Sequence, residues 1–288
     1  MASVQTNLNA SFVLRQMGIH NTLLTKSLQR LSSGYRINTN ADDPSGLSLA
    51  DKFRTQIRGL QQASRNISLA TNFIRAAEDG MTSIVNLLQD IRDLALEAAN
   101  GTVSTSDRTK NQTEINELLA EIDRLATGVR FNGIKLLNGT FASRAPTGAL
   151  FGGGTFIGSA IFQVGAYQSQ TIKTFISTSS AKALGVSGLS VTTQLAASNA
   201  VTLLNSSITH LLSRRARTGG FERRLSSATN IVDLQIETHL EAESAIRDAD
   251  IAAEVVNFTK QQILLQASTA MLAQANIQPQ SLLLLFKF

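Results

Sequence analysis

Hydrophobic residues near the two ends of the chain repeat at helical spacing. Between residues 8 and 31, steps of three and four connect Leu14, Met17, Asn21, Leu24, Leu28 and Leu31. Between residues 251 and 277, one stripe holds Ile251, Val255, Phe258, Leu265 and Leu272, and a second holds Val256, Ile263, Ala270 and Ile277. A helix with such a stripe needs a partner, because the stripe would otherwise be exposed to water. The pattern predicts that the terminal helices pair with each other and with copies of themselves.

One polar residue interrupts the first stripe. Asn21 occupies the same heptad position as Leu14 and Leu28. A buried asparagine in a helical seam lowers stability and restricts register and partner number. The sequence predicts this role for Asn21, and the alternative is a loosely packed, hydrated position.

Longer helical patterns fill most of the middle of the chain. A run of turn-forming residues over 33–46 precedes a predicted helix over 45–99, and further helices are predicted over 105–127 and 190–243. Apolar residues at helical spacing are expected to form the inward stripe of the first two: Ala77, Met81, Ile84, Leu88, Ile91, Ala95 and Ala98 on 45–99, and Ile115, Leu119, Ile122 and Ala126 on 105–127. The last helix is expected to begin near Ser244 and to end at Pro279. A helix of more than 50 residues without proline is too long to stand alone, so these segments predict a bundle or coiled coil.

Residues 129–180 differ from the rest of the chain. Glycine and threonine become frequent, helical periodicity stops, and Asn132-Gly133 and Asn138-Gly139 are typical of tight turns. Segments 162–165 and 171–176 alternate at period two, which indicates short strands. The predicted fold class is therefore mainly α: a long helical bundle or coiled-coil rod with a small β-hairpin region.

The chemistry-bearing residues form no recognisable catalytic or metal-binding pattern. The chain has no cysteine, which excludes disulfides and thiolate chemistry, and its three histidines lie far apart on predicted helices. No nucleophile, dinucleotide or zinc motif occurs. We therefore expect no enzyme activity, no cofactor and no metal.

Charge and hydropathy exclude two further partner classes. The net charge of +5 is modest, and the densest basic cluster is Arg214, Arg215, Arg217, Arg223 and Arg224. That cluster is either a nucleic-acid patch or a solvated helix face, and the lack of an aromatic platform favours the second. No run of about 20 apolar residues and no secretory signal pattern occurs. We expect neither nucleic acid nor membrane as a partner.

Several segments resemble one protein family. Residues 28–38 read LQRLSSGYRIN and residues 41–47 read ADDPSGL, which closely resembles the N-terminal signature of bacterial flagellins. Residues 246–250 (IRDAD), 257–260 (NFTK), 263–267 (ILLQA) and 271–276 (MLAQAN) resemble the C-terminal signature. Residues 131–137 and 162–166 match family stretches between them. The likeness covers nearly the whole chain in the right order.

The resemblance implies an architecture and a function. Residues 1–44 and 244–288 would be the two halves of a helix pair in the inner wall of a tubular filament, and 45–243 would form an outer rod that includes the β region. The outer domains that many flagellins insert midway are missing. The chain would be the structural subunit of the flagellar filament, exported unfolded through the flagellar type III channel to the outside of the cell. The two terminal stripes would then form the seam for polymerisation.

The resemblance also implies partners. These are copies of the chain itself, an export chaperone, the filament cap, hook-junction proteins and other flagellins. In many flagellins the rod helix presents Gln-Arg-x-Arg-Glu-Leu to an animal Toll-like receptor. The matching surface here would consist of Gln89, Asp90, Arg92, Leu94 and Glu114. Asp90 reverses a charge of the family motif, so recognition by that receptor is expected to be weak.

Three other functions remain as alternatives. A hook-junction protein would share the N-terminal signature, but residues 257–276 favour a filament flagellin. An intracellular coiled-coil adaptor would explain the heptads without explaining both terminal signatures. A basic nucleic-acid binder is the third.

Overall fold

The computed structural model describes residues 7–141 and 159–285, with side-chain environments described up to residue 277. Six helices and four short strands occur in these residues. The helices are α1 (Leu8–Ser33), α2 (Pro44–Ala99), α3 (Thr105–Gly128), α4 (Ala181–Leu184), α5 (Gln194–Arg247) and α6 (Ile251–Leu285). The strands are β1 (Arg130–Phe131), β2 (Ile134–Lys135), β3 (Ala160–Gln163) and β4 (Thr171–Thr174). The prediction of a mainly α fold with a small β region is confirmed.

The chain divides into two compact units. Unit 1 comprises Met1–Ile57 and Glu237–Phe288, and unit 2 comprises Arg58–Ile236. Both boundaries fall inside the long helices α2 and α5. The two ends of the chain therefore belong to one unit.

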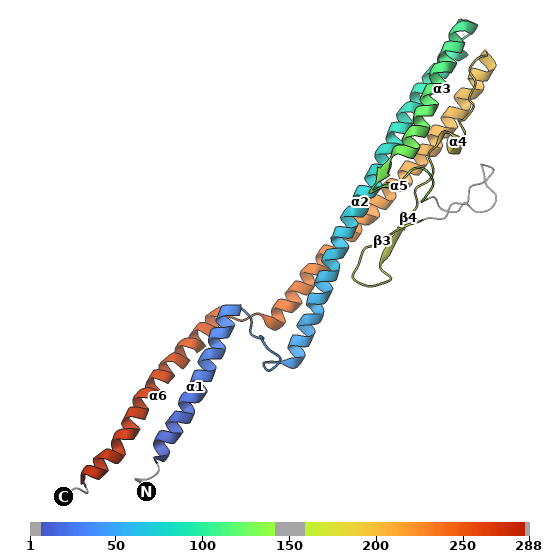
Figure 1. Cartoon of the computed structure of the whole chain (residues 1–288). Coiled ribbons are helices and arrows are strands. Elements are labelled where there is room, and N and C mark those ends of the chain that lie inside the picture. The colour runs from blue at the N-terminus through green and yellow to red at the C-terminus, as the bar shows by residue number, and fades with distance from the viewer. Residues whose placement is uncertain (1–6, 142–158, 286–288) are drawn as a thin grey trace. The chain divides into compact units, whose positions relative to one another are not determined.

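In unit 1, α1 and α6 lie side by side and run in opposite directions (Figure 1). Asn7 begins α1 by accepting a hydrogen bond from the Ala10 amide, and Gly34 ends it with φ 75°, a conformation that glycine adopts without strain. Asp250 caps α6 by accepting a 3.1 Å hydrogen bond from the Ala253 amide. Local sequence signals thus define both ends of α1 and the start of α6.

The two segments that connect this helix pair to α2 and α5 are hydrogen-bonded to each other. Tyr35 and Asp248 form an antiparallel bridge. The Arg36 amide donates to the Arg247 carbonyl at 2.6 Å, and the Ala249 amide donates to the Gly34 carbonyl at 2.9 Å. The Arg247 guanidinium lies 4.3 Å from the centroid of the Tyr35 ring, a favourable cation–π geometry. The turn-rich run of the sequence is therefore an ordered connector.

In unit 2, α2, α3 and α5 lie alongside one another around a shared core (Figure 1). The inward residues predicted for the third helical segment are all buried: Ile115, Leu119, Ile122 and Ala126. The predicted stripe of α2 is also buried: Ala77, Met81, Ile84, Leu88, Ile91, Ala95 and Ala98. The 3.6-residue period of these segments is the direct cause of the arrangement, since it places every one of these side chains on one face.

The β region forms two small hairpins in unit 2. β1 pairs with β2, and β3 pairs with β4, both antiparallel. Asn132 (φ 48°) and Gly133 (φ 79°) make the tight turn between β1 and β2, as their sequence predicts. Val129, at the base of this hairpin, and Leu137, beyond it, pack against α2 at Gly80, where a Cβ atom would come within 2.8 Å of Val129.

The boundary between α5 and α6 and the end of α6 differ from the prediction. α5 continues to Arg247 rather than residue 243, and α6 begins at Ile251 rather than near Ser244, with Asp250 as its N-cap. Between these ends α5 is continuous through Gly219-Gly220, and Leu211 and Leu225 on either side of the two glycines are fully buried. α6 extends beyond Pro279 to Leu285, so the predicted end was wrong, although a proline inside a helix removes a hydrogen bond and crowds the preceding turn. The short helix α4 was not predicted.

Candidate assembly interface

The contact between α1 and α6 is a heptad seam. Its members on α1 are Ala10, Val13, Met17, His20, Leu24, Ser27 and Leu31, all buried or half-buried. Its members on α6 are Glu254, Phe258, Gln261, Leu265, Ser268, Leu272 and Ala275, in the same burial classes. Both series advance by alternating steps of three and four, the spacing of a two-stranded coiled coil. The seam is narrow and rich in small and polar side chains.

The structure divides the predicted polymerisation seam into two groups. Six of its residues lie in the α1–α6 seam: Met17, Leu24, Leu31, Phe258, Leu265 and Leu272. The other five are exposed on the helix pair: Leu14, Asn21, Leu28, Ile251 and Val255. The assignment of Asn21 to a buried position between the terminal helices is therefore corrected. The seam uses the neighbouring positions 13, 20 and 27, which point about 100° away on the helix.

The sequence pattern did not find the polar members of the seam. The ring nitrogen Nδ1 of His20 and Oε1 of Gln261 are 2.9 Å apart and share a hydrogen bond. The Asn7 side-chain amide donates to the Ala275 carbonyl at 2.8 Å. Arg30 and Glu254 form an ion pair at 3.6 Å. These residues were missed because a search for apolar spacing passes over polar groups that are buried together with their partners.

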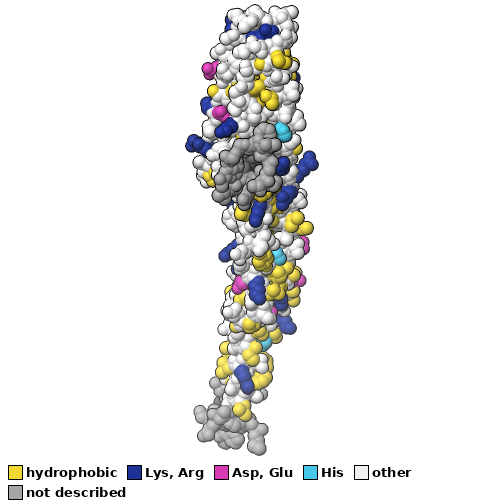
Figure 2. All heavy atoms as spheres, turned by 90° about the vertical axis from the view of Figure 1, so that its right-hand side faces the viewer, with side chains coloured by type: hydrophobic (Ala, Val, Ile, Leu, Met, Phe, Trp, Pro, Cys, Tyr) yellow, Lys and Arg dark blue, Asp and Glu magenta, His cyan; other side chains and the backbone are white. Residues whose placement is uncertain are grey.

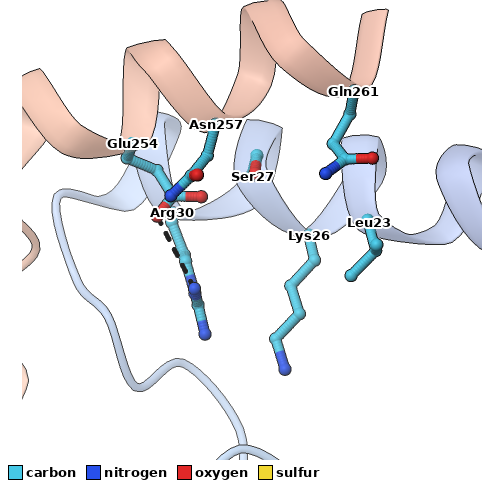
Figure 3. Close-up of a pocket in the computed structure, with 7 residues that line it drawn as sticks. All are labelled: Leu23, Lys26, Ser27, Arg30, Glu254, Asn257 and Gln261. Atoms are coloured by element: carbon cyan, nitrogen blue, oxygen red, sulfur yellow. Dashed lines mark ion pairs between the residues drawn. The ribbon is translucent and has the colours of Figure 1, made fainter. Parts of the chain in front are cut away.

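A polar recess of about 180 Å³ lies beside this seam (Figure 3). It is lined by Leu23, Lys26, Ser27, Arg30, Glu254, Asn257 and Gln261. In Figure 3, the long side chains of Lys26 and Arg30 extend from α1 in the same direction. Lys26 also pairs with Asp42 at 2.6 Å. This contact, with backbone amides of residues 38 and 39, holds the pKa of Asp42 well below its usual range, although partial burial opposes the shift.

Large apolar side chains remain exposed on the outer faces of the helix pair. On α1 they include Leu8, Phe12, Leu14, Ile19 and Leu28. On α6 they include Val256 at 66% exposure, Ile263 at 59%, Met271 and Ile277; Ala270 of the second predicted stripe is exposed as well. The face of the molecule in Figure 2 displays hydrophobic and basic side chains along the helices. The α1–α6 contact thus leaves apolar surface of the kind that marks an interaction site.

The predicted receptor surface lies on α2 and α3 of unit 2. Gln89 and Asp90 are exposed on α2, and Glu114 is exposed on α3. Arg92 is half-buried and lies 3.6 Å from Asp93. Leu94 is half-buried and packs against the core of the unit. The charge reversal at position 90 is therefore on the solvent-exposed side of the helix.

The basic cluster of α5 is partly engaged in internal contacts. Arg214 donates to the Thr178 carbonyl, and burial together with the nearby Arg217 lowers the pKa of Arg214. Arg215 pairs with Glu78 of α2 at 3.7 Å. Arg214 and Arg215 therefore connect α5 to neighbouring segments of unit 2, and this part of the cluster is not a free basic patch.

The described residues hold neither a metal-binding cluster nor a membrane-spanning helix. No group of three or more histidine, cysteine or acidic side chains is placed to hold a metal ion in residues 7–141 and 159–285. Within the same ranges, none of the helices combines the length and apolar character needed to cross a bilayer.

Comparison with known proteins places the chain in a family. Residues 4–142 match the model of the bacterial flagellin N-terminal helical region, and residues 201–286 match that of the C-terminal helical region. The chain is 41% identical to Flagellin FlaB1 of Treponema pallidum over 97% of this chain and 98% of that protein. It is 36% identical to Flagellin of Bacillus subtilis over 99% of each.

A further relative agrees with this placement. The chain is 40% identical to the flagellar filament 33 kDa core protein of Treponema phagedenis over 99% of each protein. A crystal structure of Bacillus cereus flagellin aligns with a TM-score of 0.48 and 27% identity, covering 58% of this chain and 88% of that one. The two matched regions contain the heptad-bearing helices α1 and α6, all of α2 and most of α5. This chain belongs to the bacterial flagellin family.

Proposed function

We propose that this chain is the structural subunit of the extracellular bacterial flagellar filament and that the α1–α6 pair joins the copies. The single observation that supports this role for the pair is its exposed apolar surface, including Val256, Ile263 and Ile277 of α6. Each such side chain contributes roughly 1.5–3 kcal/mol when it becomes fully buried. Contacts with several neighbouring copies would therefore supply a large part of the free energy of assembly.

The geometry favours an open polymer over a closed dimer. Exposed apolar residues occur on both helices of the pair, and they lie outside the seam between the two helices. A copy can thus present different surfaces to different neighbours, and such heterologous contacts produce helical filaments when the rotation does not close a ring. In this arrangement residues 1–44 and 244–288 form the inner wall, and 45–243 form the outer part.

Export and partners follow from the same proposal. The chain would pass unfolded through the flagellar type III channel. It has no cysteine and therefore no disulfide that would hold it folded on this route. An export chaperone would cover the exposed stripes before assembly, and the filament cap, hook-junction proteins and other flagellins would meet them afterwards. Swimming motility is the resulting biological role.

Receptor recognition is a separate part of the proposal. The exposed residues Gln89, Asp90 and Glu114 would form the receptor surface together with Arg92 and Leu94. Asp90 places a carboxylate where many flagellins place an arginine. A pocket built for a cation would thus be opposed by this charge, so we propose weak recognition by the animal Toll-like receptor.

Truncation and surface variants test the proposed role of α6. A chain that ends at Ala249 keeps the connector bridge but lacks α6, so it should stay folded in unit 2 and fail to polymerise. The variant Ile263→Ser/Ile277→Ser should polymerise less while keeping its helical circular dichroism. Gln262→Ser/Gln266→Ser, at exposed polar positions of the same helix, is the matched control.

Sedimentation after the addition of filament seeds is the measurement. Filaments formed by the chain ending at Ala249 would refute the role of α6. A soluble dimer of the unmodified chain would favour a coiled-coil adaptor instead. The match of residues 201–286 to the flagellin C-terminal region favours a filament subunit over a hook-junction protein.

A further inference from the structure

We propose that Arg30 and Glu254 act together with the adjoining connector bridge to determine the register in which α1 pairs with α6. The inference rests on the proposed role of this helix pair in assembly, because a filament accepts subunits only when their terminal helices have one fixed alignment. It assigns a specific task to a polar pair in a seam that the sequence pattern alone describes as apolar.

The position of Glu254 is unusual for a carboxylate. It is the one acidic residue in the sequences of α1 and α6, yet its exposure is 8% and it occupies a heptad position of the seam. Its ion-pair partner is Arg30, 3.6 Å away, whose side chain is 27% exposed. Figure 3 shows the pair joining the two helices beside the recess. A buried carboxylate is tolerated only where a cation and hydrogen bonds accompany it.

Apolar contacts alone would leave the register ambiguous. A heptad seam repeats every seven residues, so a shift by one heptad brings leucine and small residues opposite one another again. The exposed stripe of α6, with Val256 and Ile263, is also as apolar as the seam itself. Contacts other than hydrophobic ones must therefore distinguish the native alignment. The backbone bridge between Gly34 and Ala249 is one of them at the connector end of the pair, and the Arg30–Glu254 ion pair is the first such contact inside the seam.

A shift by one heptad separates the ion pair. Seven residues of helix correspond to about 10 Å, which is beyond the reach of an arginine side chain. In one direction Glu254 would lie near His20, an imidazole in place of a permanently charged guanidinium. In the other direction it would lie beyond the end of α1 at Ser33. In the native register the remaining cation nearby, Lys26, is already held by Asp42 at 2.6 Å.

Two further polar contacts act in the same sense. These are the His20–Gln261 hydrogen bond and the hydrogen bond from the Asn7 side chain to the Ala275 carbonyl. Both lie nearer the N-terminus of α1 than the Arg30–Glu254 pair does. Each is formed in the native alignment and is broken by a shift. Polar seam residues that specify register in this way are known from coiled coils generally, where they restrict alternatives at a cost in stability.

The test uses cysteine reporters, which is straightforward because the chain has no cysteine of its own. The native reporter is Asn7→Cys with Ala275→Cys, at two positions that already adjoin. The shifted reporter is Asn7→Cys with Ser268→Cys, which lies one heptad away on the same face. Each is placed in the full chain and mixed with filament seeds. The whole mixture is then oxidised and analysed, because the assembled fraction alone would exclude chains with a shifted alignment. The ratio of shifted to native crosslinks within one chain measures the register.

Three variants are compared in both reporter chains. Arg30→Met/Glu254→Met removes both charges and keeps the seam filled, Arg30→Met leaves the carboxylate unpaired, and Arg15→Met is the control. Arg15 lies exposed on α1 outside the seam. Its replacement makes the same chemical change as Arg30→Met.

The double variant should raise the ratio of shifted to native crosslinks about tenfold, the effect of a loss of selectivity worth about 1.4 kcal/mol. Arg15→Met should leave the ratio unchanged, and Arg30→Met should lower the yield of the native crosslink, which the double variant restores. A double variant that keeps the ratio of the unmodified chain would overturn the inference. Reporter chains that fail to sediment even without these variants would instead refute the proposed assembly function.

Discussion

Replacing Gly80 by alanine should destabilise unit 2, whereas the same replacement at Gly220 should stabilise it. Both glycines lie inside long helices, where alanine is favoured over glycine by about 0.8–1 kcal/mol. At Gly220 an added Cβ would meet no atom within 4 Å, so the full gain is expected. The two substitutions differ only in their surroundings, which makes them a matched pair.

At Gly80 the surroundings oppose the gain. An added Cβ would lie 2.8 Å from a methyl group of Val129 and 2.9 Å from a methyl group of Leu137. Both residues are held against α2, so they can move away only by disturbing the packing of the β1–β2 segment. Overpacking of this kind costs about 1–3 kcal/mol. The net result for Gly80→Ala should lie between no change and a loss of about 2 kcal/mol.

The thermal unfolding of the unseeded chain, followed by circular dichroism, measures this difference. For a unit of this size, 1 kcal/mol changes the midpoint by about 2–4 °C. Gly220→Ala should therefore melt several degrees above Gly80→Ala, with the unmodified chain between them or close to Gly80→Ala. Equal increases in the two midpoints would show that Gly80 is not closely packed and that the described contact between hairpin and helix is wrong.

Three further outcomes are expected. Because the pKa of Asp42 is lowered, its carboxylate stabilises the connector above a pH of about 4, and this contribution is lost as the pH falls further. The unmodified chain should therefore lose thermal stability between about pH 6 and about pH 3. Asp42→Asn should reduce that loss, whereas the control Asp51→Asn, at an exposed position, should not. Asn21→Leu should leave the pairing of α1 with α6 unchanged, since Asn21 is exposed, and should raise the melting temperature of filaments and alter their waveform under the microscope; a lower melting temperature with a normal waveform would indicate a hydrogen bond between copies. Asp90→Arg should increase receptor signalling by the monomer, by the equivalent of about 0.2–1 kcal/mol in binding, and equal potency would show that Asp90 does not limit recognition.

The sequence was most informative where one helix face is buried continuously. Met81, Leu88 and Ile122 were predicted to face inward and are buried, because the helical period alone determines their side. The turn at Asn132 was also predictable, because few residues other than asparagine and glycine adopt a positive φ easily.

The seam was less predictable, because two faces of α1 compete for the role. The stripe with Leu14 and Leu28 is the more hydrophobic, but the face with His20 and Ser27 is the one that meets α6. The choice depends on partners from the other end of the chain, such as Gln261, and no local pattern reveals them. Glu254 was the one available signal, since it is the single carboxylate in the sequences of the two helices.

The bridge between the two connectors has a mechanical consequence for a filament turned by a motor. The polypeptide runs between the terminal helix pair and the rod helices twice, once through residues 34–43 and once through residues 248–250. Backbone hydrogen bonds from Arg36 to Arg247 and from Ala249 to Gly34 join these two connecting segments. A twisting load on one connecting segment is therefore shared by the other. The two segments can slide past each other only if both hydrogen bonds break.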